Sequence, residues 1–203
     1  MKIKICGLMR PEDGDCVNRV KPDYAGMILS PGFRRSISDD MAKQIRARIT
    51  EPVRVVGVFV NEAPERVIEW LEEGVIDLAQ LHGEESEEEI QYIQAVTHKP
   101  VIKAVKVLDR YDVEAWLDSS ADYLLFDSGT GTGKTFDWDV LRGVAREYFL
   151  AGGVGPDNME SIGKRFAPYA VDLSSSVETD GQKDPEKINA VVALAHSLTD
   201  RLY

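Results

Sequence analysis

Short runs of apolar and β-branched residues recur along the chain, and a loop and then a helical pattern follow each run. The repeating unit is about 25 residues long, which is typical of alternating strands and helices. The run 53–60, VRVVGVFV, is almost continuously apolar, as expected for a strand of a parallel sheet covered by helices on the outside. The predicted strands are 2–6, 24–29, 53–60, 78–81, 101–107, 123–126, 148–151 and 170–173.

Several of the segments between these runs begin with helix start signals. Ser86, followed by three glutamates, forms a capping box ahead of an apolar face. Ser38, followed by two aspartates, predicts the N-cap of a helix whose apolar residues recur every four positions. Three prolines suit a first helical turn, where a missing N–H has no cost: Pro64, Pro156 and Pro185.

Eight strands and eight helices in strict alternation leave two architectures open. A doubly wound open sheet rarely needs eight regular units, whereas a (β/α)8 TIM barrel needs that number. The chain of 203 residues is short for a barrel, so its loops must be short. Because no linker or break in composition divides the chain, we predict an α/β protein with one (β/α)8 barrel domain over residues 1–203.

The charge balance narrows the classes of partner. Acidic residues number 35 and basic residues 24, which gives a net charge of −11 and argues against nucleic acid or an anionic membrane as a partner. No apolar run approaches the roughly 20 residues that span a bilayer, and the chain opens on a strand-like pattern instead of a secretory leader. Two cysteines and three scattered histidines fit neither a disulfide framework nor a metal site. We therefore expect a cytoplasmic protein with no metal.

The ends of the predicted strands carry the candidate chemistry. In a barrel of parallel strands, all the C-terminal ends meet on one face. Cys6, His82 and Asp127 stand at such ends. Cys6 is either a small buried residue or a reactive thiolate, and Asp127 is either a helix cap or an acid. On opposite sides of a bound sugar, these two groups would suit proton removal and proton donation.

Two loops are suited to a phosphate group. Glycines after the seventh strand and serines after the eighth fit the recurrent phosphate site of barrels, although AGG alone could also be a tight turn. The segment 128–135, SGTGTGKT, lacks the first glycine of a nucleotide-binding P-loop, which favours a flexible lid that closes on a phosphate. The predicted phosphate-binding residues are Gly131, Gly133, Gly152, Gly153, Ser175 and Ser176.

A set of ordered motifs makes the chain recognisable over essentially its whole length. The motifs are KICGLMRPED (4–13), VGVFVNE (56–62), QLHGEE (80–85), VIKAVKV (101–107), DSGTGTGKTFDW (127–138), LAGGVGPDN (150–158), VDLSSSVE (171–178) and KDPEKI (183–188). With these motifs the chain resembles the phosphoribosylanthranilate isomerase family of tryptophan biosynthesis, an amino-acid biosynthetic route. The resemblance implies a (β/α)8 barrel and a cofactor-free Amadori rearrangement of a phosphoribosylated anthranilate, an aminoaldose, to 1-(2-carboxyphenylamino)-1-deoxyribulose 5-phosphate.

The resemblance also implies roles for single residues. By position, Cys6 is the general base, Asp127 the general acid and Arg35 the residue that holds the anthranilate carboxylate. His82 and Asp172 are implied as contacts to the substrate. This division of roles needs a thiol whose pKa is lowered and a carboxyl whose pKa is raised.

Two departures from the family pattern bear on these roles. The second loop reads SPGFRRSIS (30–38), where the family usually has SPR followed by an aromatic residue, so Arg34 rivals Arg35 as the carboxylate clamp. Ser176 stands where the family typically has glycine, and a positive φ there would strain a serine.

Three other functions remain to be weighed. An indole-glycerol-phosphate synthase would want lysines at the strand ends, where Lys106 is available but cysteine occupies the first end. A pentose-phosphate epimerase would want metal-binding histidines and acids. A non-catalytic barrel would tolerate loss of Cys6 and Asp127. The expected partner is a small-molecule substrate, and either a monomer or a homodimer is compatible with the sequence.

Overall fold

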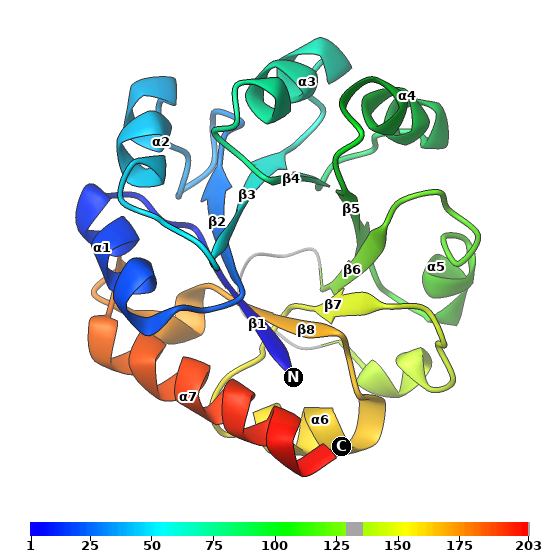
Figure 1. Cartoon of the computed structure of the whole chain (residues 1–203). Helices are drawn as coiled ribbons and strands as arrows, with labels where there is room; N and C mark the ends of the chain where they lie inside the picture. Colours follow the sequence, from blue (N-terminus) through cyan, green and yellow to red (C-terminus); the bar gives the residue numbers. More distant parts are fainter. Residues whose placement is uncertain (129–135, 203) are drawn as a thin grey trace.

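The computed structural model describes residues 1–128 and 136–202, and its centre is a closed barrel of parallel strands. The strands pair in sequence order, and β1 pairs with β8 to close the ring, with helices outside it (Figure 1). This closure confirms the predicted barrel and excludes the doubly wound open sheet. The strands are β1 (Lys2–Cys6), β2 (Tyr24–Ile28), β3 (Arg54–Phe59), β4 (Leu78–Leu81), β5 (Val101–Lys106), β6 (Tyr123–Asp127), β7 (Tyr148–Leu150) and β8 (Ala170–Leu173).

The helices form the outer layer and alternate with the strands, and residues 1–128 and 136–202 contain seven α-helices where eight were predicted. They are α1 (Pro11–Val20), α2 (Asp39–Arg46), α3 (Pro64–Glu72), α4 (Glu87–Thr97), α5 (Arg110–Glu114), α6 (Met159–Phe166) and α7 (Pro185–Leu202). After β6, the described residues 136–147 hold only a short 3-10 helix, η1 (Trp138–Leu141). Arg142 turns to an extended ψ of 130° and Gly143 has a φ of 77°, so η1 cannot continue into an α-helix.

Most of the predicted helix starts are confirmed. The Ser38 side chain accepts a hydrogen bond from the backbone N–H of Met41 at 3.3 Å, and Ser86 and Glu89 form a reciprocal capping box. Pro64 and Pro185 are the first residues of α3 and α7. Each of these helices therefore begins where the sequence places it.

The predicted role of Pro156 is wrong, because α6 begins three residues later, at Met159. The intervening turn is held by Asn158, whose Oδ1 accepts from the Gly155 N–H at 3.0 Å. Its Nδ2 donates to the Gly153 carbonyl at 2.8 Å. Asn158 thus organises the loop after β7 and delays the helix.

The core has two layers, separated by the barrel wall. On β1, Ile3 and Ile5 face the helices and belong to the larger apolar cluster, so Lys4 and Cys6 point into the barrel. No helix within the described ranges is long and apolar enough to cross a membrane. The apolar residues inside the barrel are Tyr24, Val56, Leu78, Ile102, Ala104, Leu125, Phe149, Ala151 and Ala170.

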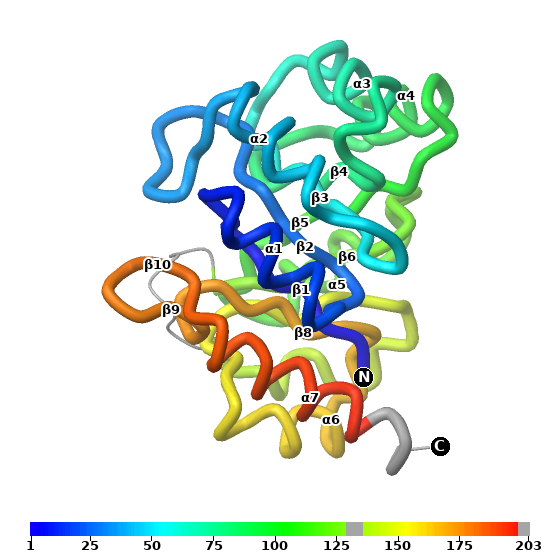
Figure 2. The backbone as a smooth tube through the Cα atoms, turned by 60° about the vertical axis from the view of Figure 1, so that its left-hand side comes forward, coloured from blue at the N-terminus to red at the C-terminus, as the bar shows by residue number. Residues whose placement is uncertain are grey.

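A small hairpin that the sequence analysis did not predict follows β8 and the 3-10 helix η2 (Ser175–Val177). Its strands are β9 (Glu178–Thr179) and β10 (Gln182–Lys183), and Asp180 and Gly181 between them have φ values of 51° and 76°. Two positive φ values define the hairpin turn for which Asp-Gly is a strong signal. The hairpin lies on the side of the molecule opposite the chain ends (Figure 2).

Candidate active site

Cys6 ends β1 on the inner face of the barrel, with only 9% of the residue exposed. Its register partner on β2 is Gly26. A Cβ on Gly26 would lie 2.8 Å from the Cys6 Sγ and 3.1 Å from the Lys4 Cε. Glycine is therefore required at this point of β2, because the thiol and the lysine chain both pass over it.

Burial raises the pKa of the Cys6 thiol, and the positive charges of Lys4 and Lys183 only partly oppose this effect. Asp172 adds to the upward shift. The lowered thiol pKa that the resemblance requires is therefore not present. The sequence could not show this direction, because it depends on the depth of the thiol and on charges from distant strands.

Lys4 and Asp172 form a buried ion pair beside Cys6. The Lys4 Nζ donates to Asp172 Oδ2 at 2.9 Å, and the two side chains are 0% and 9% exposed. Burial lowers the pKa of Lys4, but Asp172 and Cys6 together outweigh it and the net direction is upward, so Lys4 stays charged. The other oxygen of Asp172, Oδ1, is buried and has no hydrogen-bond partner among the described residues. The sequence reasoning missed Lys4, although the alternation KIKIC places it on the face of Cys6.

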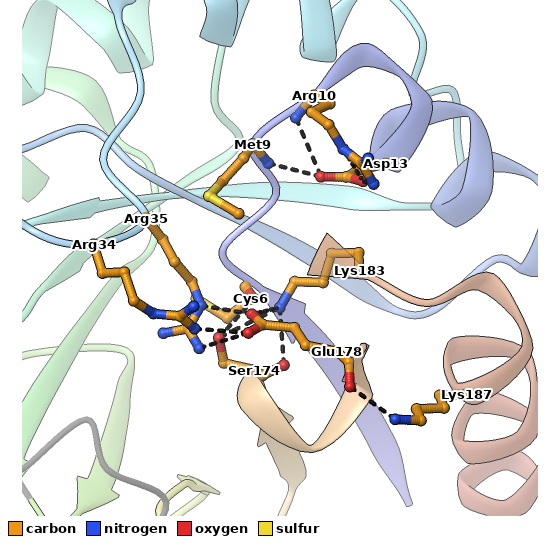
Figure 3. Close-up of polar contacts among 10 residues, drawn as sticks. All are labelled: Cys6, Met9, Arg10, Asp13, Arg34, Arg35, Ser174, Glu178, Lys183 and Lys187. Carbon is orange, nitrogen blue, oxygen red and sulfur yellow. Dashed lines mark hydrogen bonds and ion pairs between the residues drawn. The ribbon is translucent and has the colours of Figure 1, made fainter. Parts of the chain in front are cut away.

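A cluster of three cations surrounds Glu178 (Figure 3). The Arg35 Nε and Nη2 donate to its two carboxylate oxygens at 2.6 and 3.1 Å, and the Arg34 Nη2 donates at 2.6 Å. Lys183 is the register partner of Glu178 in the hairpin, and its Nζ donates to the Glu178 carboxylate at 2.9 Å. The Arg35 side chain is 10% exposed and that of Arg34 is 57% exposed. Arg35 is thus the more buried of the two arginines. Glu178 accepts from the Nε and Nη2 of Arg35 but not from its Nη1.

We expect Glu178→Gln to destabilise the fold by on the order of 3 kcal/mol at pH 7, because three cations lose their buried counter-charge. Burial raises the pKa of Glu178, but hydrogen bonds from Arg35, Arg34 and Lys183 outweigh it and lower the pKa to about 2. This stabilisation is complete above the ordinary value of 4.5 and disappears as the pH falls toward 2.

Urea unfolding at pH 7 and pH 3 measures this effect, and the difference between variant and wild type should shrink at pH 3. The matched control is Glu73→Gln, which removes a 42% exposed carboxylate paired with Lys43 at 2.8 Å. An exposed pair of this kind contributes little to the stability of the fold. Equal losses for the two variants, or a loss independent of pH, would contradict the expectation.

His82 and Asp127 meet at the ends of β4 and β6. The His82 Nε2 lies 3.6 Å from Asp127 Oδ2, and the His82 Nδ1 lies 2.7 Å from the Gln80 side-chain amide. With the amide nitrogen donating, Nδ1 accepts and the ring proton sits on Nε2, facing Asp127. Sequence reasoning missed Gln80, whose signal is that it shares the inward face of β4 with His82.

The loop after β7 closes onto Asp127 through a glycine. Gly152 has a φ of 75°, and a Cβ there would lie 2.8 Å from Asp127 Oδ1. Gly153 follows with a φ of 76°. The predicted phosphate glycine Gly152 is therefore placed directly beside the predicted acid.

The loop after β8 runs next to the loop after β7. A Cβ on Gly155 would lie 3.7 Å from the Cβ of Ser176. Ser175 and Ser176 are exposed and lie in η2. Ser176 does not have a positive φ, so serine in place of glycine causes no backbone strain. Gly131 and Gly133, with nearly all of the expected lid, lie outside the described residues.

A second buried ion pair fixes the loops after β3 and β4. Glu85 accepts from Lys103 Nζ at 2.8 Å and from the backbone N–H groups of Asn61 and Gly83 at 2.7 and 2.8 Å. Lys106 is exposed at the rim. Over residues 1–128 and 136–198, no three His, Cys, Asp or Glu side chains are grouped so that they could hold a metal ion.

Comparisons with known proteins place the chain in one family over nearly its whole length. Residues 3–193 match the family model for N-(5'-phosphoribosyl)anthranilate (PRA) isomerase. The isomerase of that name from Endomicrobium trichonymphae is 44% identical over 202 residues, 97% of this chain and 99% of the relative.

Two solved structures cover 97% of this chain and 99% of their own, each with a TM-score of 0.85. One shows monomers generated from the dimeric phosphoribosylanthranilate isomerase of Thermotoga maritima, at 34% identity. The other, at 33% identity, is a phosphoribosyl anthranilate isomerase in complex with reduced 1-(o-carboxyphenylamino)-1-deoxyribulose 5-phosphate. From its barrel, its strand-end groups and these matches, the chain belongs to the family of N-(5'-phosphoribosyl)anthranilate isomerases.

Proposed function

We propose that this chain is the isomerase that converts N-(5'-phosphoribosyl)anthranilate to 1-(2-carboxyphenylamino)-1-deoxyribulose 5-phosphate in tryptophan biosynthesis. The observation that carries the proposal is that, in a chain of this family, Cys6 and Asp127 end strands β1 and β6 of one closed parallel barrel. Both groups therefore belong to the same rim. The solved relative in complex with the reduced form of the proposed product supports the same substrate class.

Ring opening is the step assigned to Asp127. Its protonated carboxyl donates a proton to the furanose ring oxygen, and the bond between that oxygen and C1 breaks. The electron pair of the anthranilate nitrogen forms the new C1–N double bond, which gives a protonated Schiff base. The His82 Nε2–H, 3.6 Å from Asp127 Oδ2, faces the carboxylate that this step leaves behind.

Proton removal from C2 is the step assigned to Cys6. The adjacent iminium makes this proton acidic, and the Cys6 thiolate takes it to give an enolamine. The enolamine tautomerises to the ketone as the enol oxygen loses a proton and C1 gains one. Exchange with water then returns Cys6 and Asp127 to their starting protonation states, so substrate and product contain the same atoms.

Both ends of the substrate need a fixed position. The adjoining loops after β7 and β8 offer backbone N–H groups to the phosphate at Gly152, Gly153, Ser175 and Ser176. Arg35 offers its Nη1 to the anthranilate carboxylate while Glu178 holds its Nε and Nη2. Local groups of this kind are needed because the chain as a whole has a net charge of −11. Fixing both ends aligns C2 with the thiol and the ring oxygen with the acid.

We expect Arg35→Ala to raise KM about 10- to 100-fold, since a charge-assisted hydrogen bond to a carboxylate contributes roughly 1.5–3 kcal/mol. Arg34→Ala should raise KM far less, because the Arg34 side chain is 57% exposed and that of Arg35 only 10%. Steady-state kinetics on both variants provides the measurement. Equal effects on KM would mean that neither arginine binds the anthranilate carboxylate specifically.

A direct assay tests the proposed function. Purified protein is mixed with freshly made phosphoribosylanthranilate, without added metal or nucleotide, and the loss of substrate fluorescence is followed. Catalysed loss supports the proposal, and a rate equal to that of buffer refutes it. The same assay separates this function from the synthase and epimerase alternatives, which would not consume this substrate.

Two further proposals concern the cellular compartment and the oligomeric state. We propose a cytoplasmic enzyme, since both Cys6 and Cys16 are free, buried thiols that suit a reducing compartment. Its proposed partner is the small-molecule substrate alone, without nucleic acid or a membrane. Size-exclusion chromatography with light scattering would decide between a monomer and the homodimer that the Thermotoga maritima relative forms.

A further inference from the structure

The two charges of the Lys4–Asp172 pair stand beside the thiol that the proposed mechanism uses as its base. Lys4 and Cys6 are two residues apart on β1 and share its inward face. Both side chains cross the same residue, because a Cβ on Gly26 would meet the Lys4 Cε at 3.1 Å and the Cys6 Sγ at 2.8 Å. The lysine chain and the thiol therefore lie together over Gly26.

The neighbouring strand fixes where the lysine charge sits. Asp172 is the register partner of Lys4 on β8, and its Oδ2 accepts from the Lys4 Nζ at 2.9 Å. Lys4 is fully buried, so solvent does not screen its charge from the thiol. An ammonium group in such surroundings interacts strongly with any charge that forms on the Cys6 sulfur.

Other charged groups face Cys6 from the neighbouring elements. Lys183, on β10, is another cation that acts on the thiol. Its Nζ donates to the Ser174 carbonyl and to Glu178, both at 2.9 Å, so most of its charge is already paired. Arg35 also lies near, packed against Gly7, and Glu178 holds it in the same way. Lys4 is also paired with a carboxylate, but its chain crosses Gly26 together with the thiol, which makes it the cation best placed to act on a thiolate.

We propose that Lys4 is a positioning residue for the isomerase reaction: its buried ammonium stabilises the Cys6 thiolate, and Asp172, which holds that ammonium beside the thiol, competes with the thiolate for its charge. The inference rests on the proposed function in one respect, because that function assigns the thiolate as the general base. The proton that leaves Cys6 goes to water, and no other bond changes. Without Lys4, burial and the Asp172 charge would raise the pKa of the Cys6 thiol further.

The test measures the thiolate directly, by the pH dependence of iodoacetamide alkylation in a Cys16→Ser background. The thiolate is the reacting form, so the midpoint of the rate against pH reports its formation. We expect Lys4→Met to move the midpoint to higher pH and to slow alkylation at neutral pH by about tenfold or more. Asp172→Asn should move the midpoint to lower pH, because it removes a negative charge beside the sulfur.

Opposite shifts from the two halves of one ion pair are not expected of a purely structural pair. Because Lys4→Met leaves Asp172 buried and unpaired, it could prevent folding, so the double variant Lys4→Met/Asp172→Asn provides a neutral interior of similar shape. Its midpoint should still lie above that of wild type, since the lysine acts on the thiol more strongly than the aspartate does.

The matched control is Lys103→Met, which removes another buried lysine, paired with Glu85 at 2.8 Å on β5 at the far side of the ring. It should leave the Cys6 midpoint unchanged. Unchanged midpoints in the Lys4 and Asp172 variants, shifts in the same direction, or a larger shift from Lys183→Met would each overturn the proposal. Retained turnover in Cys6→Ala would refute the mechanism instead, and the alkylation midpoints would still decide the role of Lys4.

Discussion

Cys6→Ala is expected to abolish turnover, with a loss in kcat on the order of 10⁴-fold, the upper part of the range for a lost general base. Alanine keeps the strand end small and apolar, so the carboxylate and phosphate contacts of the substrate stay in place and KM changes little. Steady-state kinetics by loss of substrate fluorescence measures both quantities. Cys6→Ser keeps the size of the side chain but not its acidity and should be nearly as inactive.

The control for Cys6 is the other cysteine. Cys16 is buried in α1 and packs in the apolar layer between helices and barrel. Cys16→Ala should therefore leave kcat close to that of wild type, at a small cost in stability. A Cys6→Ala variant that keeps its kcat would remove the thiol from the mechanism.

Asp127→Asn is expected to lower kcat by about 10²- to 10⁴-fold, because the amide has the shape of the carboxyl but no acidic proton to donate to the ring oxygen. The contacts around the group favour an unchanged local structure. His82 Nε2 lies 3.6 Å away and Gly152 leaves space for either side chain. The rate loss should therefore appear without a comparable loss of stability in urea.

A carboxylate elsewhere on the barrel provides the comparison. Asp40 is exposed in the first turn of α2, and Asp40→Asn should leave kcat unchanged. If Asp127→Asn also retained nearly the wild-type rate, the acid would have to be another group. His82 would be the first to test, because it lies at the same rim.

The positions of the strands could be predicted from the sequence because burial in a barrel leaves a periodic signal. Each predicted strand agrees with the structure to within one residue at either end. The predicted gathering of Cys6, His82 and Asp127 followed from topology alone, since parallel strands end on one rim. The connection after β6 was less predictable because η1 is a short turn without helical periodicity.

The partners of the site residues depend on contacts between distant parts of the chain. Arg35 binds Glu178, 143 positions away, and the Asp180-Gly181 turn brings Lys183 opposite the same carboxylate. A search for hairpin turns could have found this turn, but no sequence pattern says which cation it reaches.

The sequence by itself determined the barrel, the order of its strands and the chemical groups at its rim, because these depend on local periodicity and on the parallel direction of the strands. The tertiary structure decided the ionisation of those groups. Cys6 has its raised pKa because it is buried, and Lys4 stays charged because β8 sets Asp172 beside it. Both effects depend on solvent exclusion and on distances between charges, which exist only once the ring has closed.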